Sequence, residues 1–350
     1  MGLKKSVTAI QTQPPSFQIA HRTSHIAPPM SHPTFCLVAD ASCDIPAQAL
    51  THPQLRVLPV HVFVGDAQFY DQRDALATQR FYKTSLTSPK AVHGRSEPMS
   101  TEDMIAALNS QLAMQFDQLL GVFVASSRSA IYQRAKTAVS QARRDAFALR
   151  ARAGKLEILQ ADCLDSQAFF AGYGVQVMDL LDLLNKGAGI ADAISRQRVT
   201  APQTYAYMAP GEVAYILQRA ALKGEQSVSP LAGLAAKALS ITPILRGHMG
   251  QTEPVGRKLG KIKAREAVVE MGLRMIKNEL LLSHHICFSF SGPLKEIEKL
   301  ESYQRLLTVA QSKAVQVHLT CMSMTGSVNV GPGALVLGVL AKPHRVDDLL

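Results

Sequence analysis

Short apolar runs that do not alternate with polar residues constrain the fold of this chain more than any other feature of its sequence. In the first half of the chain these runs cover residues 35–39, 57–64, 119–125 and 156–161. A strand that is apolar on both sides is buried on both faces, as in a parallel sheet covered by helices. We therefore predict an α/β domain with a parallel sheet over residues 34–200.

The segments between these runs have the spacing of helices. Apolar residues recur at intervals of three and four over residues 131–142, so one face of a helix there would be apolar. Ser100, followed three positions later by Asp103, resembles a capping box with the shorter acid and predicts the start of another helix. Both helices are expected to cover the sheet.

A second α/β domain is predicted beyond a polar stretch at residues 196–204, which marks the candidate boundary. An amphipathic helix is expected over residues 264–282. The segments with the character of strands are residues 205–208, 285–290, 315–321 and 334–340. The second domain is predicted to span residues 201–343, with a tail at residues 344–350.

Residues 1–33 differ in composition from the rest of the chain. They contain neither Asp nor Glu and are rich in Ser, Thr, Gln, His and Pro. The apolar run at residues 7–10 is too short for the core of a secretory signal peptide. We therefore predict an unstructured leader, because such a segment has little apolar surface to bury.

The formal net charge of +10 raises the question of nucleic acid or an anionic membrane, because a positive field attracts both. The densest basic run, at residues 257–265, has no interleaved aromatic residue, which favours a solvated loop and helix start. No uninterrupted apolar stretch approaches the roughly eighteen residues of a membrane span. We therefore expect neither a nucleic-acid-binding protein nor a membrane protein.

Cysteines and histidines form no pattern that indicates a disulfide scaffold or a zinc site. The five cysteines are scattered without a CxxC pair, which favours a reducing compartment and buried thiols. His284 and His285 precede a predicted strand, and four further histidines are isolated, so none has the ligand spacing that is typical of zinc. The isolated ones are His61, His93, His248 and His318. We expect a cytoplasmic protein without a metal.

Motifs of the common enzyme classes are missing from the sequence. No GxGxxG, GxxxxGK[ST] or GxSxG string occurs, which removes the usual evidence for dinucleotide binding, a P-loop and an α/β-hydrolase. No nucleophile with a partner base is recognisable either. The sequence therefore predicts a protein that is not an enzyme and uses no cofactor.

Polar residues follow three of the predicted strands. They lie at residues 40–44, 126–129 and 162–163. Ligands of open parallel sheets gather at the carboxyl ends of the strands, so these clusters are candidates for a binding site. Asp40 and Asp44 could bind a metal or act as acid and base, but the ordinary start of a helix explains them better.

The serines at residues 126–129 are the most informative cluster. Hydroxyls at a helix start lie beside free backbone N–H groups and the positive end of the helix dipole, which favours a carboxylate or phosphate. The alternative is that Ser127 or Ser129 caps the helix, as serine commonly does.

Fragments spread along the chain resemble the DegV family of bacterial proteins. Residues 37–46 resemble the family's opening strand and its D-S-x-x-D-[IL]-P loop, and residues 96–100 resemble its T-S-Q-P-[ST] loop. The other matching segments are residues 58–66, 69–71, 81–82, 126–135, 241–245 and 331–334. Their order along the chain is that of the family, which makes the resemblance more specific than any single fragment.

The resemblance implies a two-domain α/β fold in which a narrow apolar tunnel holds a long-chain fatty acid and hydroxyls at its mouth hold the carboxyl group. Ser96 and Ser129 match the family's head-group positions. The further candidate ligand-binding residues are Arg95, Ser126, Ser127, Asn329 and Gly331. Burial of each methylene stabilises the bound chain by about 0.8 kcal/mol, so the tunnel would supply most of the affinity.

The sequence also departs from the family's motifs. Arg95 replaces a threonine, Gln226 stands where an arginine is expected, and Asn329 stands where a histidine is expected. In members that serve a fatty acid kinase, that arginine and histidine help to handle the phosphorylated head group. The sequence therefore favours a non-catalytic lipid carrier or sensor, with the acyl-carrying subunit of a bacterial fatty acid kinase as the alternative.

Overall fold

The computed structural model describes residues 34–155, 157–223 and 241–350. The predicted leader at residues 1–33 and the departure at Gln226 lie outside these residues. Within the described part of the chain, the strands form three sheets. The first is a parallel sheet, the second is a mixed sheet and the third is a small antiparallel sheet.

The first sheet has the strand order β2-β1-β6-β7, and all neighbouring strands are parallel. Its members are β1 (Phe35–Asp40), β2 (Leu55–Leu58), β6 (Gln118–Phe123) and β7 (Gln160–Asp165). Every residue of β1 and β6 is buried, as the apolar runs predict. The predicted α/β fold with a parallel sheet is confirmed.

Two strands of the first half differ from their predictions. The run at residues 57–64 is divided at Pro59, whose missing N–H cannot join a ladder, into β2 and β3 (Val60–Val64). β3 pairs with β4 (Ala67–Asp71) and β5 (Arg95–Pro98) in the small sheet, so residues 95–98 form a strand and not a loop.

The fourth parallel strand was predicted at residues 156–161 but is β7. Leu159 is buried just before the strand, whereas Ile158 is 74% exposed. The apolar residues of this region therefore do not coincide with the residues that pair with β6. As a consequence, Asp162 and Cys163 lie within the strand, and the residue at its carboxyl end is Asp165.

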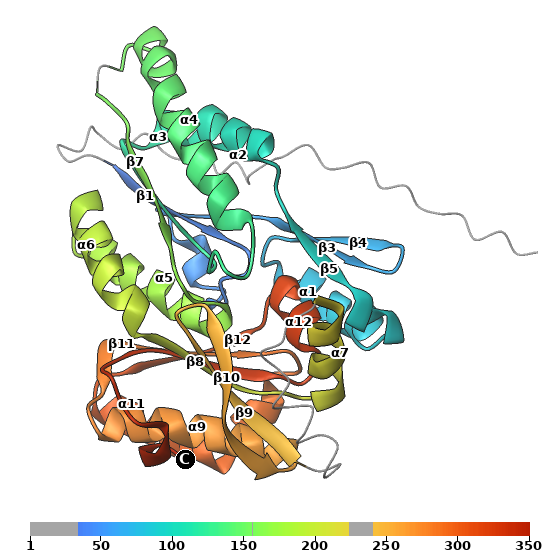
Figure 1. The fold of residues 1–350 in the computed structure, drawn as a ribbon. Coiled ribbons are helices and arrows are strands. Elements are labelled where there is room, and N and C mark those ends of the chain that lie inside the picture. The colour runs from blue at the N-terminus through green and yellow to red at the C-terminus, as the bar shows by residue number, and fades with distance from the viewer. Residues whose placement is uncertain (1–33, 156, 224–240) are drawn as a thin grey trace, which may run out of the picture. The chain divides into compact units, whose positions relative to one another are not determined.

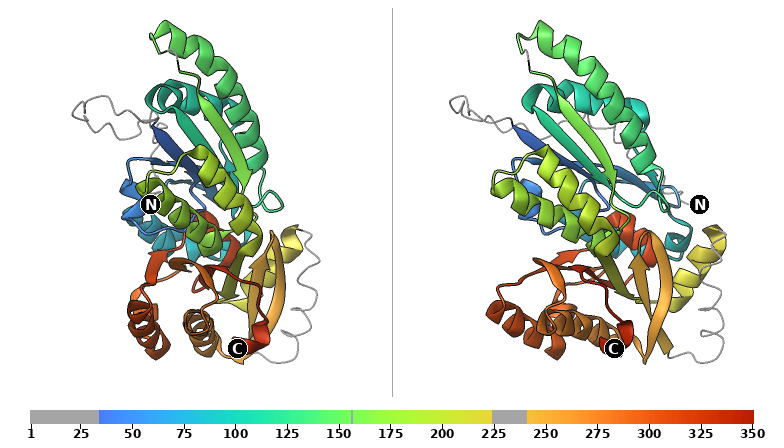
Figure 2. Two further views of the ribbon diagram at one scale, coloured as in Figure 1. Left: turned by 90° about the vertical axis from the view of Figure 1, so that its left-hand side faces the viewer. Right: turned by 60° about the vertical axis from the view of Figure 1, so that its left-hand side comes forward.

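Helices cover both faces of the first sheet (Figures 1 and 2), with α4 (Ile131–Arg152) on one face and α5 (Phe170–Asn185) and α6 (Ile190–Thr200) on the other. The helix predicted over residues 131–142 is part of α4. The predicted cap is also present, since the Ser100 hydroxyl accepts a hydrogen bond from the Asp103 N–H at the start of α2 (Thr101–Ala107).

The second sheet has the order β10-β9-β8-β13-β11-β12. Its strands are β8 (Thr204–Ala209), β9 (Ile241–His248), β10 (Gln251–Leu259), β11 (Leu281–Phe290), β12 (Gln316–Cys321) and β13 (Leu335–Ala341). The β11–β12 pair is parallel and the other pairs are antiparallel. Four of these strands were predicted, whereas the β9–β10 ribbon was not, because its outer strand is polar and partly exposed.

The helices α9 (Lys261–Lys277) and α11 (Glu301–Ser312) cover one face of this sheet (Figure 1). α9 ends five residues before the predicted limit at residue 282, where Glu279 has a left-handed φ of 52°. The basic run at residues 257–265 was expected to be a solvated loop and helix start. The helix start is present, because α9 begins at Lys261, but the preceding residues belong to the end of β10 and not to a loop. No described helix is long and apolar enough to cross a membrane.

α5 packs against the other face of the second sheet, where it contacts β8, β11 and β13, and it also contacts β1. A Cβ atom on Gly338 of β13 would lie 2.0 Å from the carbonyl oxygen of Ala171, so this close approach requires glycine. α5 therefore lies between the two large sheets.

The predicted boundary at residues 196–204 is helical. It contains the end of α6 and a 3₁₀ turn at Ala201–Gln203. The remaining elements include α1 (Ala75–Phe81), α3 (Ala113–Gln115), α7 (Val213–Lys223), α10 (Lys295–Glu298) and α12 (Met324–Val330). Short 3₁₀-helical segments lie at Ala49–Thr51, Pro89–His93 and Val346–Asp348, and π-helical segments at Tyr82–Leu86 and Leu108–Leu112. The domain limits at residues 200 and 343 stay predictions.

Candidate functional site

A cavity of about 710 Å³ lies beside the carboxyl ends of β1 and β6, within the roughly 300–1,000 Å³ of small-molecule sites. Its wall is built by β5, the loop before α4, the start of α5, β8, β9, α7 and α12. This is the region that the strand-end rule for parallel sheets predicts.

Apolar side chains from β3, from β8 and β9 of the second sheet, and from the helices α4, α5, α7 and α12 form much of this wall, together with residues beside these elements. They are Val60, Val124, Ile131, Phe169, Phe170, Met208, Ile216, Leu245 and Val330. A hydrocarbon chain that entered the cavity would exchange water for these side chains, at about 0.8 kcal/mol for each buried methylene. The cavity is therefore chemically suited to an aliphatic ligand.

Five of the seven predicted site residues border the cavity, namely Arg95, Ser96, Ser127, Ser129 and Asn329. Ser126 and Gly331 do not. The Ser126 N–H faces Asp165 at the end of β7, at 3.2 Å from each carboxylate oxygen. The Gly331 carbonyl accepts a 2.7 Å hydrogen bond from the Ser291 hydroxyl. The structure thus brings together residues from three distant motifs.

The two serines before α4 have different surroundings. The Ser127 hydroxyl donates to the Gly250 carbonyl at 3.0 Å and joins this loop to the β9–β10 turn. The Ser129 hydroxyl accepts a 3.2 Å hydrogen bond from the Ile131 N–H, which leaves its hydrogen to donate to another group. Ser129 is therefore better placed than Ser127 to donate to a ligand in the cavity.

α4 begins beside the cavity, as the serine cluster predicts, but later than expected. Its N-cap is Ala130, which has no side chain that could accept a capping hydrogen bond. Ala130 and Ile131 both border the cavity. The positive end of a helix of 22 residues thus lies at the cavity wall.

Arg95 is held by its own strand and its neighbour. Its Nε lies 2.8 Å from a carboxylate oxygen of Glu97, and its guanidinium stacks 4.0 Å from the centre of the Phe63 ring. More than half of the side chain is exposed. These contacts keep the guanidinium along the edge of the small sheet.

Arg219 of α7 is a buried cation on the cavity wall that the sequence analysis missed. Its guanidinium donates to the Val92 carbonyl at 3.0 Å and to the Gly94 carbonyl, and its second terminal nitrogen donates to Asn329 Oδ1 at 2.9 Å. Asn329 in turn donates to the Thr325 carbonyl at 2.7 Å. An arginine among apolar residues at helical spacing is the signal that could have found it.

Asp40 is not part of a helix start but fastens β1 to β6. Its carboxylate accepts hydrogen bonds from the Ser42 N–H at 2.9 Å, from the Ser42 hydroxyl and from the Val124 N–H at 3.0 Å. Burial raises the pKa of Asp40, and these hydrogen bonds oppose that effect. All acceptor contacts of this carboxylate are to the protein, so its role here is structural.

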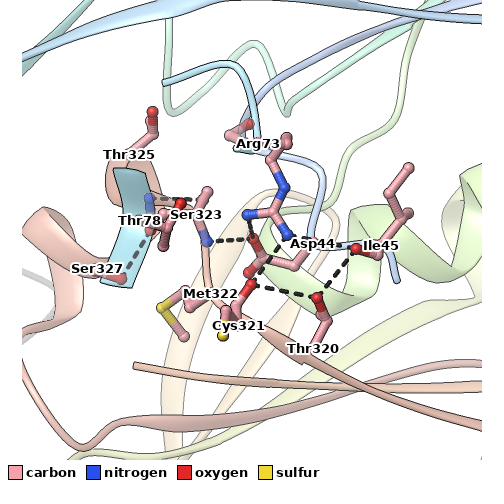
Figure 3. A network of polar contacts seen from close by, with 12 residues as sticks. Asp44, Ile45, Arg73, Thr78, Thr320, Cys321, Met322, Ser323, Thr325 and Ser327 are labelled. Carbon is pink, nitrogen blue, oxygen red and sulfur yellow. Dashed lines mark hydrogen bonds and ion pairs between the residues drawn. The ribbon is translucent and has the colours of Figure 1, made fainter. Parts of the chain in front are cut away.

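Asp44 also lies outside any helix, since the next helical turn begins at Ala49. Its carboxylate is fully buried and lies 3.3 Å from the guanidinium of Arg73 (Figure 3). The Ser323 N–H donates to the same carboxylate at 2.8 Å, and Arg73 donates to the Cys321 carbonyl at 2.9 Å. Burial raises the pKa of Asp44, and the charge of Arg73 opposes this.

Asp71 completes this buried network. Its carboxylate accepts hydrogen bonds of 2.7 Å from both the N–H and the hydroxyl of Thr325, the second residue of α12. Because Thr325 and Asn329 both border the cavity, the network fixes the helix that forms one wall of the site. The helix-start interpretation of the two aspartates was therefore wrong.

Two expectations about histidines were also wrong. His284 and His285 lie within β11 and do not precede it. His318 does not stand alone, because its Nε2 lies 2.9 Å from Nδ1 of His285 on the neighbouring strand.

A model of the DegV family, described as uncharacterised proteins, matches residues 34–342. A DegV domain-containing protein of Xanthomonas campestris is 30% identical over 308 residues, which cover 88% of this chain and 98% of the relative. A DegV domain-containing protein of Xanthomonas axonopodis matches to the same extent.

Solved structures share the fold. A DegV family protein from Thermus thermophilus, described as fatty acid binding, has a TM-score of 0.64 at 17% identity and covers 88% of this chain and 100% of its own. The fatty acid kinase B3 protein of Streptococcus pneumoniae, loaded with linoleic acid, has a TM-score of 0.66 at 16% identity over 88% and 100% of the two chains.

Proposed function

Since this chain belongs to the DegV family, we propose that its cavity binds a long-chain fatty acid or a similar amphiphilic anion. The observation that carries the proposal is one cavity of about 710 Å³ whose wall combines apolar side chains with the hydroxyls of Ser96 and Ser129. The fatty acid ligands of solved structures that share this fold support the same ligand class.

The acyl chain would occupy the part of the cavity that is lined by apolar residues of β8, β9, α5, α7 and α12. The carboxylate would accept hydrogen bonds from Ser129 and Ser96, beside the positive end of α4. A hydrogen bond to a charged group contributes about 1.5–3 kcal/mol, so these hydroxyls would set the orientation of the ligand more than its total affinity. Arg95 would contribute little, because Glu97 and Phe63 hold it.

The protein would act as a carrier or sensor and not as an enzyme. The carboxylates near the cavity already have partners within the protein. Asp40 accepts a hydrogen bond from the N–H of Val124, which follows β6, Asp44 pairs with Arg73, and Asp71 accepts a hydrogen bond from Thr325 of α12. Among the described residues at the cavity wall, we recognise no nucleophile with a partner base.

Native mass spectrometry and lipid extraction of the purified full-length chain test the proposal. We expect a bound species with the mass of a fatty acid, and uptake of added fatty acid after delipidation. Protein that carries no acyl ligand and takes none up would refute it. Octanol of matched concentration is the control for non-specific partition of an aliphatic chain.

A second candidate function is that of an acyl-carrying subunit of a fatty acid kinase. Its support is the 2.9 Å contact between Arg219 and Asn329, which places a buried guanidinium at the position where the family has a histidine. Arg219 would then substitute for the arginine that Gln226 replaces. A kinase assay with ATP separates the two functions, because formation of acyl phosphate on the bound fatty acid is required by the second function alone.

A further inference from the structure

Far from the cavity wall, two histidines meet at one carboxylate oxygen. Nε2 of His284 lies 2.8 Å from Oδ2 of Asp182, and Nε2 of His285 lies 3.0 Å from the same atom. The three ligand atoms lie within 4.8 Å of one another. Asp182 comes from α5, whereas both histidines come from β11.

Two consecutive residues of a regular strand point to opposite faces of the sheet. The pairing between β11 and β13 is irregular here, since Leu281 pairs with Ala341 but Ile286 pairs with Val339. This interruption lets both imidazoles turn toward α5. Bulges of this kind are common beside functional sites, where they re-aim a side chain.

The contact between His285 and Asp182 is close but is not a hydrogen bond of normal geometry. The His285 side chain is 1% exposed, and its Nε2 has no hydrogen-bond partner among the described residues despite the carboxylate oxygen at 3.0 Å. A zinc ion with bonds of about 2.0–2.1 Å in tetrahedral geometry holds its ligand atoms about 3.3 Å apart. The two nitrogen–oxygen separations, 2.8 and 3.0 Å, are slightly shorter than this, so a bound ion requires the side chains to move apart by less than about 1 Å.

The other nitrogen of His285, by contrast, has a hydrogen-bond partner. Its Nδ1 lies 2.9 Å from Nε2 of His318 on β12. A metal-bound imidazole usually donates its second N–H to a neighbouring acceptor, which fixes the tautomer and the ring orientation. A neutral His318 accepts such a hydrogen bond and leaves Nε2 of His285 with the lone pair that a metal needs.

The electrostatic surroundings are compatible with a cation. The nearby guanidinium of Arg196 is paired with Asp179 through contacts of 2.7 and 2.8 Å, so Asp182 keeps its own negative charge for another partner. His284 is about half exposed. It also borders a surface hollow of about 370 Å³, which would give an ion access from solvent.

We propose that Asp182, His284 and His285 bind Zn²⁺, with His318 as the residue that orients His285 and with solvent in the fourth coordination position. Two imidazoles and a carboxylate are donors that zinc accepts. The ion would fasten α5, which lies between the large sheets, to the irregular part of β11, and it would stabilise the folded chain without taking part in ligand binding.

The proposal is tested by zinc titration of chelator-treated full-length protein, measured by calorimetry and by the visible spectrum of Co²⁺ as a substitute. We expect one site that His284→Ala or Asp182→Asn weakens by roughly 100-fold or more, since loss of an orienting residue alone costs about 10–100-fold. Co²⁺ should show the intense absorption of a four-coordinate site in the unmodified chain and lose it in both variants.

His93→Ala is the matched control, because His93 is exposed and lies on a different element. The zinc affinity of the His93→Ala variant should equal that of the unmodified chain. All other histidines are kept in each variant. Equal zinc binding by the unmodified chain and His284→Ala, or the absence of zinc binding by the unmodified chain, would overturn the proposal. His284 is half exposed, so its replacement tests the site without removing a core side chain.

Discussion

Two groups of polar residues lie near the carboxyl end of β1 and differ in how their hydrogen bonds are used. In the network of Asp44, Asp71 and Arg73, charged groups contact one another and the backbone at the start of α12. Figure 3 shows the part that Asp44, Arg73 and Ser323 form. On the cavity wall, the Ser129 hydroxyl still has a hydrogen to donate. The comparison teaches that a polar group near a cavity is a candidate for ligand contact when its hydrogen-bonding capacity is not already used by other groups of the protein.

Arg73→Met should have the largest effect on stability. It leaves Asp44 buried without its counter-ion, which typically costs about 3–5 kcal/mol in the free energy of unfolding. Urea denaturation measures this loss. Arg345→Met is the control, because the Arg345 side chain is 81% exposed, and it should change stability little. A loss below about 1 kcal/mol for Arg73→Met would show that the network is not structural.

Ala220→Phe tests the other side of the comparison by filling the cavity. Ala220 is buried and borders the cavity, so a benzyl group there would exclude about three or four methylenes of an acyl chain, or about 3 kcal/mol of binding. Fatty acid affinity, measured by calorimetry, should fall by roughly 100-fold. Ala151→Phe, at an exposed position of α4, is the matched control. Unchanged affinity for Ala220→Phe would place the ligand elsewhere.

Ser129→Ala should weaken fatty acid binding and leave the fold intact. Loss of a hydrogen bond to a charged head group costs about 2 kcal/mol, or roughly 30-fold in affinity. The affinity for the corresponding fatty alcohol should change less, because its head group is neutral. If the acid and the alcohol lose the same affinity, Ser129 does not contact the carboxylate.

Ser127→Ala should lower stability and leave fatty acid binding intact, which is the opposite of Ser129→Ala, and its effect should be smaller. Its hydroxyl is used by the Gly250 carbonyl, so the substitution should lower the free energy of unfolding by about 1 kcal/mol and change fatty acid affinity little. Thermal denaturation and calorimetry on the same samples separate the two quantities. A large loss of affinity without loss of stability would reverse the roles assigned to the two serines.

Much of the fold could be predicted because its signals are local. β1 and β6 are apolar on both sides, and their burial follows from that pattern. β10 escaped prediction because polar residues alternate along an exposed strand, and β7 was displaced because Leu159 is apolar and buried without being part of the strand. These errors arise where pairing, and not side-chain polarity, determines the strand.

The candidate site was less predictable than the fold. Motif positions led to Ser96 and Ser129, which border the cavity. Arg219 was missed because its partners, the carbonyls of Val92 and Gly94, lie more than 120 residues away along the chain. Asp182 was missed for the same reason, since no sequence spacing relates α5 to the irregular part of β11.

The sequence by itself determined the α/β class, the parallel order of apolar strands with covering helices, and the DegV family, because these depend on periodicity and on short motifs. The tertiary structure alone decided which polar residues are available to a ligand. Asp44 and Ser129 are both polar residues near strand ends in the sequence, yet Asp44 forms an ion pair with Arg73 from the loop between β4 and α1. Availability depends on long-range contacts, and a linear pattern does not contain them.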